Sequence, residues 1–435
     1  MNNEGMNVKL KHFVSLTKGR NPMAFLDSGI YPYLTMDYLR GRDKDVKYVD
    51  FDEKLVPVKE NEILILWDGA NAGEIMQSKV GFLSSTMAKI SAKNEKLANH
   101  YLFYLLKNFE KVLKDFAGGT TIPHLDPQVL LHSSFFIPSL KKQTAIAAFL
   151  DDKTAKIDRA IAQKEKMIAL LKERKQIIIQ NAVTKGLNYD LCDENDSPDA
   201  QGKNQSPSHN HKKSQFRRMK HSGVEWIGEI PEGWEVPKMK HLCHFILDGT
   251  HGSFPRVENG YRLLSVRNII DGKFVFRDDD SMVSTRHFKE ISSKFEIQEG
   301  DIQLAIVGAT MGKVAIVENL SERIVTQRSL STIRINQSKC MIKYVTYFIQ
   351  SELFQSFLWN NTGFSAQPGI YLGTIQNAHL PMPRIEEQEK IVTHIETQST
   401  KIDKAIKLQE QQIEKLKELK STLIDSAVTG KIKVN

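Results

Sequence analysis

Positively charged and amide side chains gather in the turn-rich segments of two regions of the chain, residues 1–136 and residues 223–382. Arginine can bond guanine through two hydrogen bonds at once, and asparagine or glutamine can do the same with adenine. Such side chains also contact phosphate groups. The pattern therefore predicts nucleic-acid-reading loops in both regions. The candidates in the first region are Lys18, Arg20, Asn21, Arg40, Arg42, Lys44, Thr120, Thr121 and His124. The candidates in the second region are Thr250, His251, Arg256, Arg262, Arg267, Asn268, Arg277 and Gln367.

Residues 307–314, VGATMGKV, are the nearest approach to a catalytic phosphate-binding loop. That loop needs four residues between its glycines and a Ser or Thr after its lysine, whereas here three residues lie between the glycines and a valine follows the lysine. The related stretch 69–74 lacks the lysine altogether, so we predict a structural turn used twice. The sequence also lacks the motifs expected of a methyltransferase, a nuclease or a helicase, and we assign no catalytic residue.

Two histidine-rich fragments resemble parts of metal sites. His241-Leu242-Cys243-His244 and His209-Asn210-His211 each lack a second pair of ligands at zinc spacing. We expect the first fragment to pack in a core strand and the second to be solvated. The acidic runs 151–152 and 278–280 are expected at the surface. The chain is therefore predicted to bind no metal and no cofactor of its own.

Composition restricts the class of protein. The chain has 435 residues, a formal charge of +8 and a pI of about 9.0, which favours an acidic partner such as nucleic acid. Its three cysteines are scattered, so a disulfide framework is not expected. The sequence shows neither a signal peptide nor an apolar run long enough to span a membrane. We expect a cytoplasmic protein with no membrane partner.

An internal repeat organises the chain. Residues 138–184 align without a gap with residues 383–429, 245 positions later, and 18 of the 47 positions are identical. Both copies carry an apolar stripe with a period near 11 residues, which predicts a long helix with a nearly straight seam. We expect the two helices to pair with each other as an intramolecular antiparallel coiled coil, and the alternative is that each packs only on its own domain. The predicted seam is Ile146, Leu150, Ile157, Ile161, Ile168, Leu171, Ile178, Ile391, Ile395, Ile402, Ile406, Ile413, Leu416 and Leu423.

Polar residues interrupt this seam at matching places in the two copies. They either fix the register of the pair or point outward to partners, and the sequence leaves both open. The first copy has Lys153, Lys164 and Lys175, and the second has Gln398, Gln409 and Lys420.

The remaining chain divides around these helices into an α+β architecture that we expect to be pseudo-twofold symmetric. Residues 1–136 and 223–382 are predicted to be two similar strand-rich domains, followed by helices within 137–186 and 383–435. Residues 187–222 are polar, with basic residues near their end, and are predicted to be a linker. That basic cluster is either a solvated tether or a non-specific phosphate contact.

Three motifs make the family resemblance specific. Residues 222–236, SGVEWIGEIPEGWEV, resemble the opening of target-recognition domains in specificity (S) subunits of type I restriction–modification systems. Two further motifs resemble those of the same family. One is the Pro-x-x-x-x-Gln start of each repeat, from Pro138 to Gln143 and from Pro383 to Gln388, and the other is the IDRAI or IDKAI sequence within each repeat. The resemblance covers essentially the whole chain. The first domain departs from it, because it lacks the GVEWIGEIPEGW opening.

The resemblance implies a non-catalytic DNA-binding subunit. Each target-recognition domain would read one half-site of a bipartite double-stranded DNA target, and the helices would set the spacing. Two methyltransferase (M) subunits and two restriction/translocase (R) subunits would assemble with it. S-adenosylmethionine, ATP and Mg²⁺ would belong to those partners. Two other interpretations remain, namely a stand-alone DNA-binding scaffold or regulator and a coiled-coil interaction protein without DNA binding.

Overall fold

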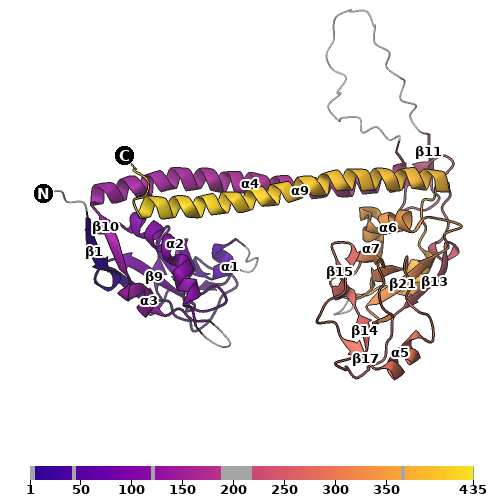
Figure 1. The fold of residues 1–435 in the computed structure, drawn as a ribbon, viewed down its shortest axis with the longest axis horizontal. Coiled ribbons are helices and arrows are strands. Elements are labelled where there is room, and N and C mark those ends of the chain that lie inside the picture. The colour runs from indigo at the N-terminus through magenta and orange to yellow at the C-terminus, as the bar shows by residue number, and fades with distance from the viewer. Residues whose placement is uncertain (1–4, 42–45, 119–122, 188–217, 364–367, 435) are drawn as a thin grey trace, which may run out of the picture. The chain divides into compact units, whose positions relative to one another are not determined.

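The computed structural model describes residues 5–41, 46–118, 123–187, 218–363 and 368–434. The chain divides into two compact units, residues 1–166 with 409–435 and residues 167–408. Each unit holds one strand-rich domain and parts of two long helices, α4 (Leu140–Lys185) and α9 (Ile385–Val428), which Figure 1 draws in magenta and yellow. The predicted α+β class is confirmed.

The first unit contains two four-stranded sheets and a two-stranded one. The first sheet is antiparallel, in the order β2 (Val14–Lys18), β9 (Met87–Ala92), β6 (Ile63–Leu66) and β7 (Ile75–Gln77). The second has the order β4 (Tyr48–Val49), β3 (Tyr31–Leu34), β8 (Gly81–Leu83) and β5 (Pro57–Val58), with β3 and β8 parallel. The edge pair is β1 (Gly5–Lys9) and β10 (Ser134–Pro138).

Strand β6 shows how this core is layered. All four of its side chains are buried, but successive side chains point to opposite faces of a strand. Ile63 and Ile65 pack in a cluster with helix α2 (Asn99–Asp115), whereas Leu64 and Leu66 pack in a second cluster with β3 and β8. The sheet is therefore covered on both sides. Short helices α1 (Met36–Leu39) and α3 (Pro127–His132) and the 3-10 turn Leu10–His12 complete the unit.

The second unit repeats this plan with additions. Its larger sheet has the order β13 (Cys243–Asp248), β21 (Leu330–Ile335), β18 (Ile302–Ala305), β19 (Val314–Ile316), β16 (Lys273–Phe274) and β15 (Ile269–Ile270). Its smaller sheet has the order β17 (Met282–Val283), β14 (Tyr261–Leu264) and β20 (Ile324–Thr326), with β14 and β20 parallel. The helices are α5 (Thr285–Ser292), α6 (Ile342–Gln350), α7 (Glu352–Asn360) and α8 (Leu372–Asn377), and 3-10 turns lie at Met239–His241 and Val266–Asn268.

The turn predicted to be structural is used in both domains. Gly69 and Gly73 follow β6, with φ angles of 118° and 92°, and Gly308 and Gly312 follow β18, with φ angles of 88° and 91°. Side chains other than glycine rarely adopt such angles. Gly312 donates to the carbonyl of Ala305 at 2.9 Å, which closes the turn back onto its strand. The Gly-rich segments are hairpin turns, as expected.

The histidine fragment 241–244, at the start of β13, is placed differently from the expectation. Leu242 is buried, but His241 and His244 are exposed on either side of it. His241 ends a 3-10 turn and His244 is the second residue of β13, and neither side chain faces the core. Burial raises the pKa of the Cys243 thiol to about 12, which keeps it protonated at neutral pH.

The two domains begin differently, as the sequence indicates. In the first, β1 pairs with β10 immediately before α4. In the second, isolated bridges join Glu235 to Met382 and Lys238 to His379, immediately before α9. The second domain adds a hairpin of β11 (Met219–His221) and β12 (Glu229–Pro231), within which Trp226 stacks on Phe357 at 4.4 Å. The extra opening segment therefore covers the second domain without replacing its edge.

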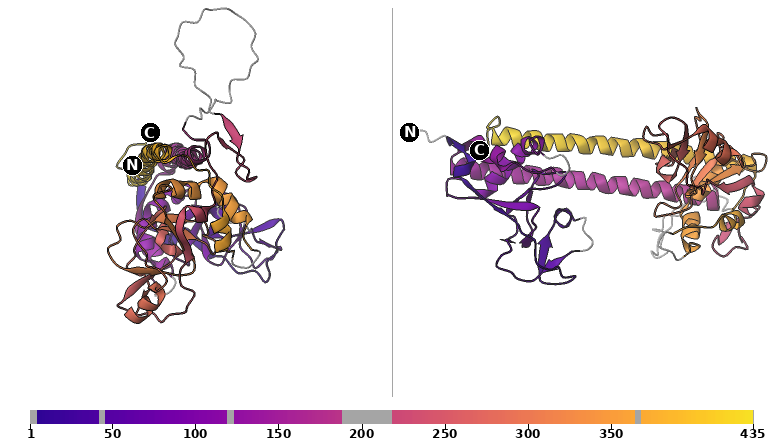
Figure 2. Two further views of the ribbon diagram at one scale, coloured as in Figure 1. Left: turned by 90° about the vertical axis from the view of Figure 1, so that its right-hand side faces the viewer. Right: turned by 90° about the horizontal axis from the view of Figure 1, so that it is seen from below.

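Helices α4 and α9 run side by side in opposite directions within each unit (Figures 1 and 2). In the first unit, Ile146 and Leu150 near the start of α4 share a core with Ile424 and Ala427 near the end of α9. In the second unit, residues 179–183 of α4 share a core with residues 391–395 of α9. The antiparallel intramolecular pair is confirmed. Each end of the helix pair also packs on a domain. The apolar stripe therefore serves both the pairing of the helices and their packing on the domains, which the sequence presented as alternatives.

Every predicted seam residue is buried or half-buried. Burial is complete or nearly so at the domain-covered ends, where Leu150, Ile391 and Ile395 are 0% exposed. It is partial at Ile161, Ile168 and Leu171, in the middle of α4. Ile179 and Ala182, which continue the apolar stripe of the sequence, and Val183, which the sequence did not indicate, are more deeply buried than Ile178 because the second domain covers them.

Candidate nucleic-acid interface

One half-buried carboxylate joins two predicted DNA-contacting residues in the first domain. Lys18 ends β2, and Asp68 follows β6. Lys18 Nζ lies 3.2 Å from Asp68 Oδ2 and 5.2 Å from the centre of the Trp67 ring. His124 Nδ1 lies 2.6 Å from the other oxygen of Asp68. The structure therefore brings Lys18 and His124 together, and the residue that does so was absent from the sequence candidates.

The other described candidates of the first domain have separate environments. Arg20 and Asn21 are exposed, and the side-chain Oδ1 of Asn21 accepts from Ser85 Oγ at 2.6 Å. Arg40 is half-buried and forms an ion pair with Glu74. Arg42, Lys44, Thr120 and Thr121, and Gln367 of the second domain, lie outside the described residues.

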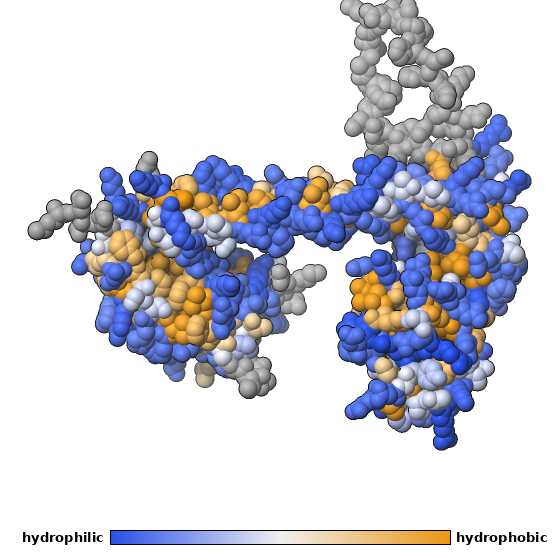
Figure 3. All heavy atoms as spheres, viewed as in Figure 1, coloured by the Kyte–Doolittle hydropathy of each residue, from blue (hydrophilic) through white to orange (hydrophobic). Residues whose placement is uncertain are grey.

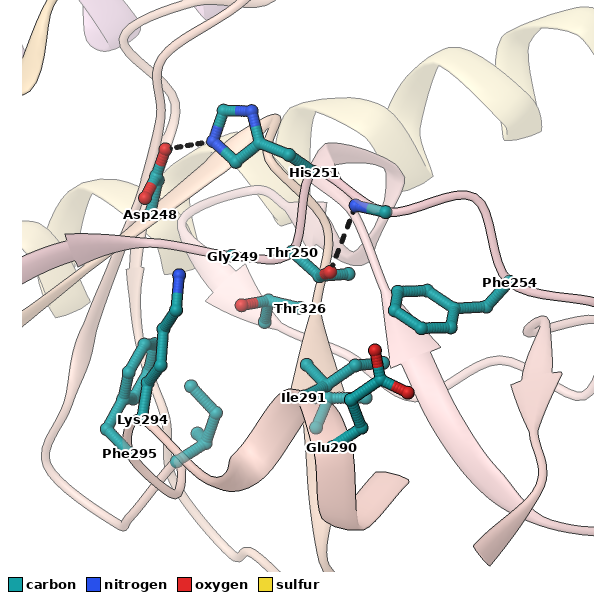
Figure 4. Close-up of a pocket in the computed structure, with 13 residues that line it drawn as sticks. Asp248, Gly249, Thr250, His251, Phe254, Glu290, Ile291, Lys294, Phe295 and Thr326 are labelled. Carbon is teal, nitrogen blue, oxygen red and sulfur yellow. Dashed lines mark hydrogen bonds and ion pairs between the residues drawn. The ribbon is translucent and has the colours of Figure 1, made fainter. Parts of the chain in front are cut away.

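In the second domain, Asp248, Thr250 and His251 stand at the end of β13 on the wall of a pocket of about 340 Å³ (Figure 4). Asp248 and His251 Nε2 form an ion pair or hydrogen bond, and Thr250 Oγ1 accepts from the Gly252 backbone at 3.2 Å. The opposite wall carries Glu290 and Lys294 from α5 and the chain after it. The pocket therefore combines both signs of charge with aromatic and aliphatic surface.

Four candidates of the second domain are held by one buried aspartate. The Asp280 side chain is 1% exposed, and it accepts from Asn268 Nδ2 at 2.8 Å and from the Arg277 backbone at 2.8 Å. Arg267 Nη2 lies 3.1 Å and Arg262 Nη1 3.4 Å from its two oxygens. The surface position expected for this acidic run is therefore wrong for Asp280, because four donors compensate the desolvation of its charge.

These contacts change what each of the four candidates can do. Asn268 is 0% exposed and its amide caps a turn, so this residue lies inside the domain and cannot reach DNA. The guanidinium of Arg262 is mostly covered, and the hydrogen bond that it donates to Glu322 raises the pKa of Arg262. Arg267 and Arg277 are 41% exposed and share Asp279. Arg256 is exposed and donates to the Phe254 carbonyl at 2.8 Å.

The glutamine of each Pro-x-x-x-x-Gln motif fastens a long helix to its domain. Gln143 is 0% exposed; its Oε1 accepts from the Ala98 backbone, and its Nε2 donates to the carbonyls of Lys96 and Pro138, all at 2.8 Å. Gln388 repeats this arrangement, accepting from the Met341 backbone at 2.8 Å. Ala98 and Met341 precede α2 and α6. Gln143 therefore links the start of α4 to the start of α2, and Gln388 links the start of α9 to the start of α6.

The polar residues that interrupt the seam make contacts across the pair. Lys164 Nζ lies 3.2 Å from Gln409 Oε1 and also bonds Gln412. Lys175 pairs with Asp403 at 2.8 Å and Lys420 with Asp158 at 2.7 Å. Lys153 instead lies 3.7 Å from Asp152 on its own helix. Lys164, Lys175, Gln409 and Lys420 therefore connect α4 to α9 instead of pointing outward.

Apolar side chains also remain on the outside of the helix pair. Figure 3 shows them as orange patches within its hydrophilic surface. Among the described helix residues, Met167, Leu170, Leu408 and Leu419 are each about half exposed, at 48%, 49%, 52% and 53%. In the described part of the chain, no helix combines the length and apolar character needed to cross a membrane.

Comparisons with known proteins agree with this arrangement. The sequence model of the family described as type I restriction modification DNA specificity domain matches residues 2–168 and 231–418. The chain is 30% identical over 434 residues to the type I restriction enzyme MjaVIII specificity subunit of Methanocaldococcus jannaschii, covering 98% of this chain and 92% of that protein. It is 22% identical over 390 residues to the type I restriction enzyme EcoBI specificity subunit of Escherichia coli, covering 86% and 74%.

A solved structure described as showing complex assembly and conformational transition of the type I R-M system superposes with a TM-score of 0.66. It covers 98% of this chain and 97% of that chain at 14% identity, so the likeness is one of fold. Each matched sequence region takes in one strand-rich domain and part of the repeat helix that follows it. The chain therefore belongs to the family of type I restriction–modification DNA specificity subunits.

Proposed function

We propose that this chain reads a bipartite double-stranded DNA target and brings the other subunits of a type I restriction–modification system to it. The observation that carries the proposal is the presence of two domains with equivalent sheets that expose different polar side chains. In the first domain, β2 pairs with β9 and ends in a cluster of polar side chains. In the second domain, β13 pairs with β21 and also ends in a cluster of polar side chains. Equivalent scaffolds with different surface chemistry suit two different half-sites.

The long helices would set the distance between the half-sites. Helix α4 has 46 residues, which corresponds to about 69 Å at 1.5 Å per residue. Half-sites read from one face of DNA are spaced by about one turn, or roughly 34–36 Å, or multiples of it. A helix of this length is sufficient for such a spacing.

The partners in this proposal are two methyltransferase subunits and two restriction/translocase subunits. The half-exposed apolar residues on the helix pair support a docking role, because such side chains lose water contact when a partner helix covers them. S-adenosylmethionine, ATP and Mg²⁺ would be bound by those partners. This chain would supply sequence recognition and a platform.

The proposal is tested by mapping methylated sites across the genome of a host that carries the partner subunits, with and without this chain. Methylation should depend on the chain and fall on two short sequences at a constant separation. Unchanged methylation without the chain, or methylation at a single uninterrupted sequence, would contradict the proposal.

A further inference from the structure

We infer that the last residue of β2 in the first domain and the last residue of β13 in the second are equivalent specificity-determining positions, occupied by Lys18 and Asp248. This inference rests on the proposed function and deepens it, because it names the side chains that distinguish the half-sites. The first support for the inference is that the backbone around Lys18 and the backbone around Asp248 make the same contacts.

Both residues immediately precede a glycine that packs against the neighbouring strand end. A Cβ on Gly19 would lie 2.1 Å from the Ser84 carbonyl oxygen, and one on Gly249 would lie 2.3 Å from that of Thr326. The Gly19 N–H donates to Met87 at 2.9 Å, and the Gly249 N–H donates to Leu330 at 3.0 Å. The same close approach and hydrogen bond therefore fix the preceding residue in each domain.

The chemistry at this shared position is opposite in the two domains. Lys18 is a cation and a hydrogen-bond donor, whereas ionised Asp248 is an acceptor. Each has an exposed imidazole beside it, since the side chains of His124 and His251 are 60% and 63% exposed. Two domains on one scaffold that read different bases are expected to differ at such a position.

An aspartate fixes the imidazole in both domains, but from different strands. Asp68 follows β6 and bridges to His124 in the backbone. The corresponding bridge in the second domain joins Val307, after β18, to Gly369, so no carboxylate or imidazole stands at this bridge. The aspartate–histidine pair of the second domain is built instead from Asp248 and His251 at the end of β13 (Figure 4).

The bases that these groups suit follow from their hydrogen-bonding capacity. A carboxylate accepts only, so the imidazole nitrogen beside it carries the proton in the neutral ring, and the other ring nitrogen becomes an acceptor. Lys18 suits the O6 and N7 acceptors of guanine, with His124 Nε2 available to an adjacent amino group. Asp248 and His251 Nδ1 together suit the amino groups of cytosine or adenine.

Asp68 acts in this scheme as a positioning residue. It contacts Lys18 and His124 through its two oxygens, at 3.2 Å and 2.6 Å, and its own side chain is only 22% exposed. Its loss would free both readers without removing either. A change in base preference at Asp68 would therefore come from geometry and not from a missing contact to DNA.

The test uses the full chain with its methyltransferase partner and selection of bound duplexes from a random library. Lys18→Met and Asp68→Asn should each change base preference only in the first half-site, and Asp248→Asn only in the second, by about 10-fold or more at the affected base pair. Asp68→Glu keeps the carboxylate and should retain the original preference. The matched control is Lys89→Met, which breaks the Lys89–Glu62 pair at 3.3 Å on the same sheet and should leave both half-sites unchanged.

Thermal unfolding of each variant separates recognition from folding. Unchanged base preferences in all three variants, with binding weakened equally for all sequences, would overturn the inference. A change in the wrong half-site would overturn it as well. If the wild-type complex selected no bipartite sequence, the proposed function itself would fail, and this result is distinguishable from the other two.

Discussion

Lys164 of α4 and Gln409 of α9 occupy the same position in the two sequence repeats, and they bond to each other at 3.2 Å. A residue of an antiparallel pair can face its own repeat equivalent only where the register is symmetric. Two ion pairs have the same symmetry. Asp158 pairs with Lys420, and the residues at the equivalent positions of the other repeat, 245 positions away, are Asp403 and Lys175, which also pair. The polar interruptions of the seam are thus consistent with a single register.

The first prediction concerns the stability cost of this register. Lys164→Leu replaces a partly buried cation with an apolar side chain and should raise the free energy of unfolding by about 1 kcal/mol, because less charge is desolvated. Chemical denaturation measures this change. Lys156→Leu, at an exposed position of the same helix, should alter stability by less than about 0.5 kcal/mol. A clear loss of stability in Lys164→Leu alone would show that the polar contacts are net stabilising.

A second prediction concerns the flanking ion pair. Asp158→Lys places two cations together and should destabilise the protein, and adding Lys420→Asp should restore most of the loss. The coupling should be about 0.2–1 kcal/mol, since both side chains are partly exposed, and it should shrink at high salt. A double-mutant cycle measures it. A coupling of zero at low salt would mean that this pair does not contribute to register.

A third prediction concerns the buried glutamines. Gln143→Leu leaves the Ala98 N–H without its partner and should destabilise the first domain by about 2 kcal/mol. Gln388→Leu should do the same to the second domain. Gln163→Leu, exposed on α4, is the matched control and should change stability little. Equal unfolding curves for Gln143→Leu and the control would exclude the fastening role.

The long-range order of the chain could be predicted from sequence because it depends on repetition. The 245-residue offset, the apolar period and the Pro-x-x-x-x-Gln motif were sufficient to predict two long helices, their antiparallel pairing and two similar domains. A pattern that repeats along a helix reports which face is buried. The motif located Gln143 and Gln388, but their partners are 45 and 47 residues away and had to come from the structure.

The candidate site was predictable only in part, because its organisers are neither arginines nor lysines. Asp68 and Asp280 each gather residues from separate segments of the chain, and a single sequence does not show which segments meet. Asn268 has a side-chain amide of the kind that can bond adenine, but the oxygen of this amide accepts from the Ser265 backbone and caps a turn. Two aspartates in one acidic run, 279 and 280, have opposite burial, which charge patterning cannot distinguish.

A fourth prediction separates the two domains through Asp280. Asp280→Asn removes the carboxylate that holds three arginines and Asn268, and it should destabilise the second domain by about 3 kcal/mol. Reading of the second half-site should be lost while the first is still recognised. Asp278→Asn, which is exposed in the same run, should affect neither. Selection of bound duplexes measures both half-sites together, and loss of the first one would argue against independent domains.

A fifth prediction concerns spacing. Inserting four residues into α4 between Ile157 and Ile168, and four at the matching place in α9, keeps the helices paired and lengthens each by about 6 Å. The permitted separation of the half-sites should grow by about two base pairs, given 3.4 Å per step, with their sequences unchanged. Methylation mapping reports both quantities. An altered half-site sequence at the original separation would show that the helices do not set the spacing.

The most direct measurement of the central claim is the methylation map of a chain whose residues 6–136 are replaced by the corresponding domain of another family member. If each domain reads one half-site, the map should show a new first half-site, the original second half-site and the original separation. If both half-sites change, or if the original first half-site persists, the domains do not read DNA independently and the account is contradicted.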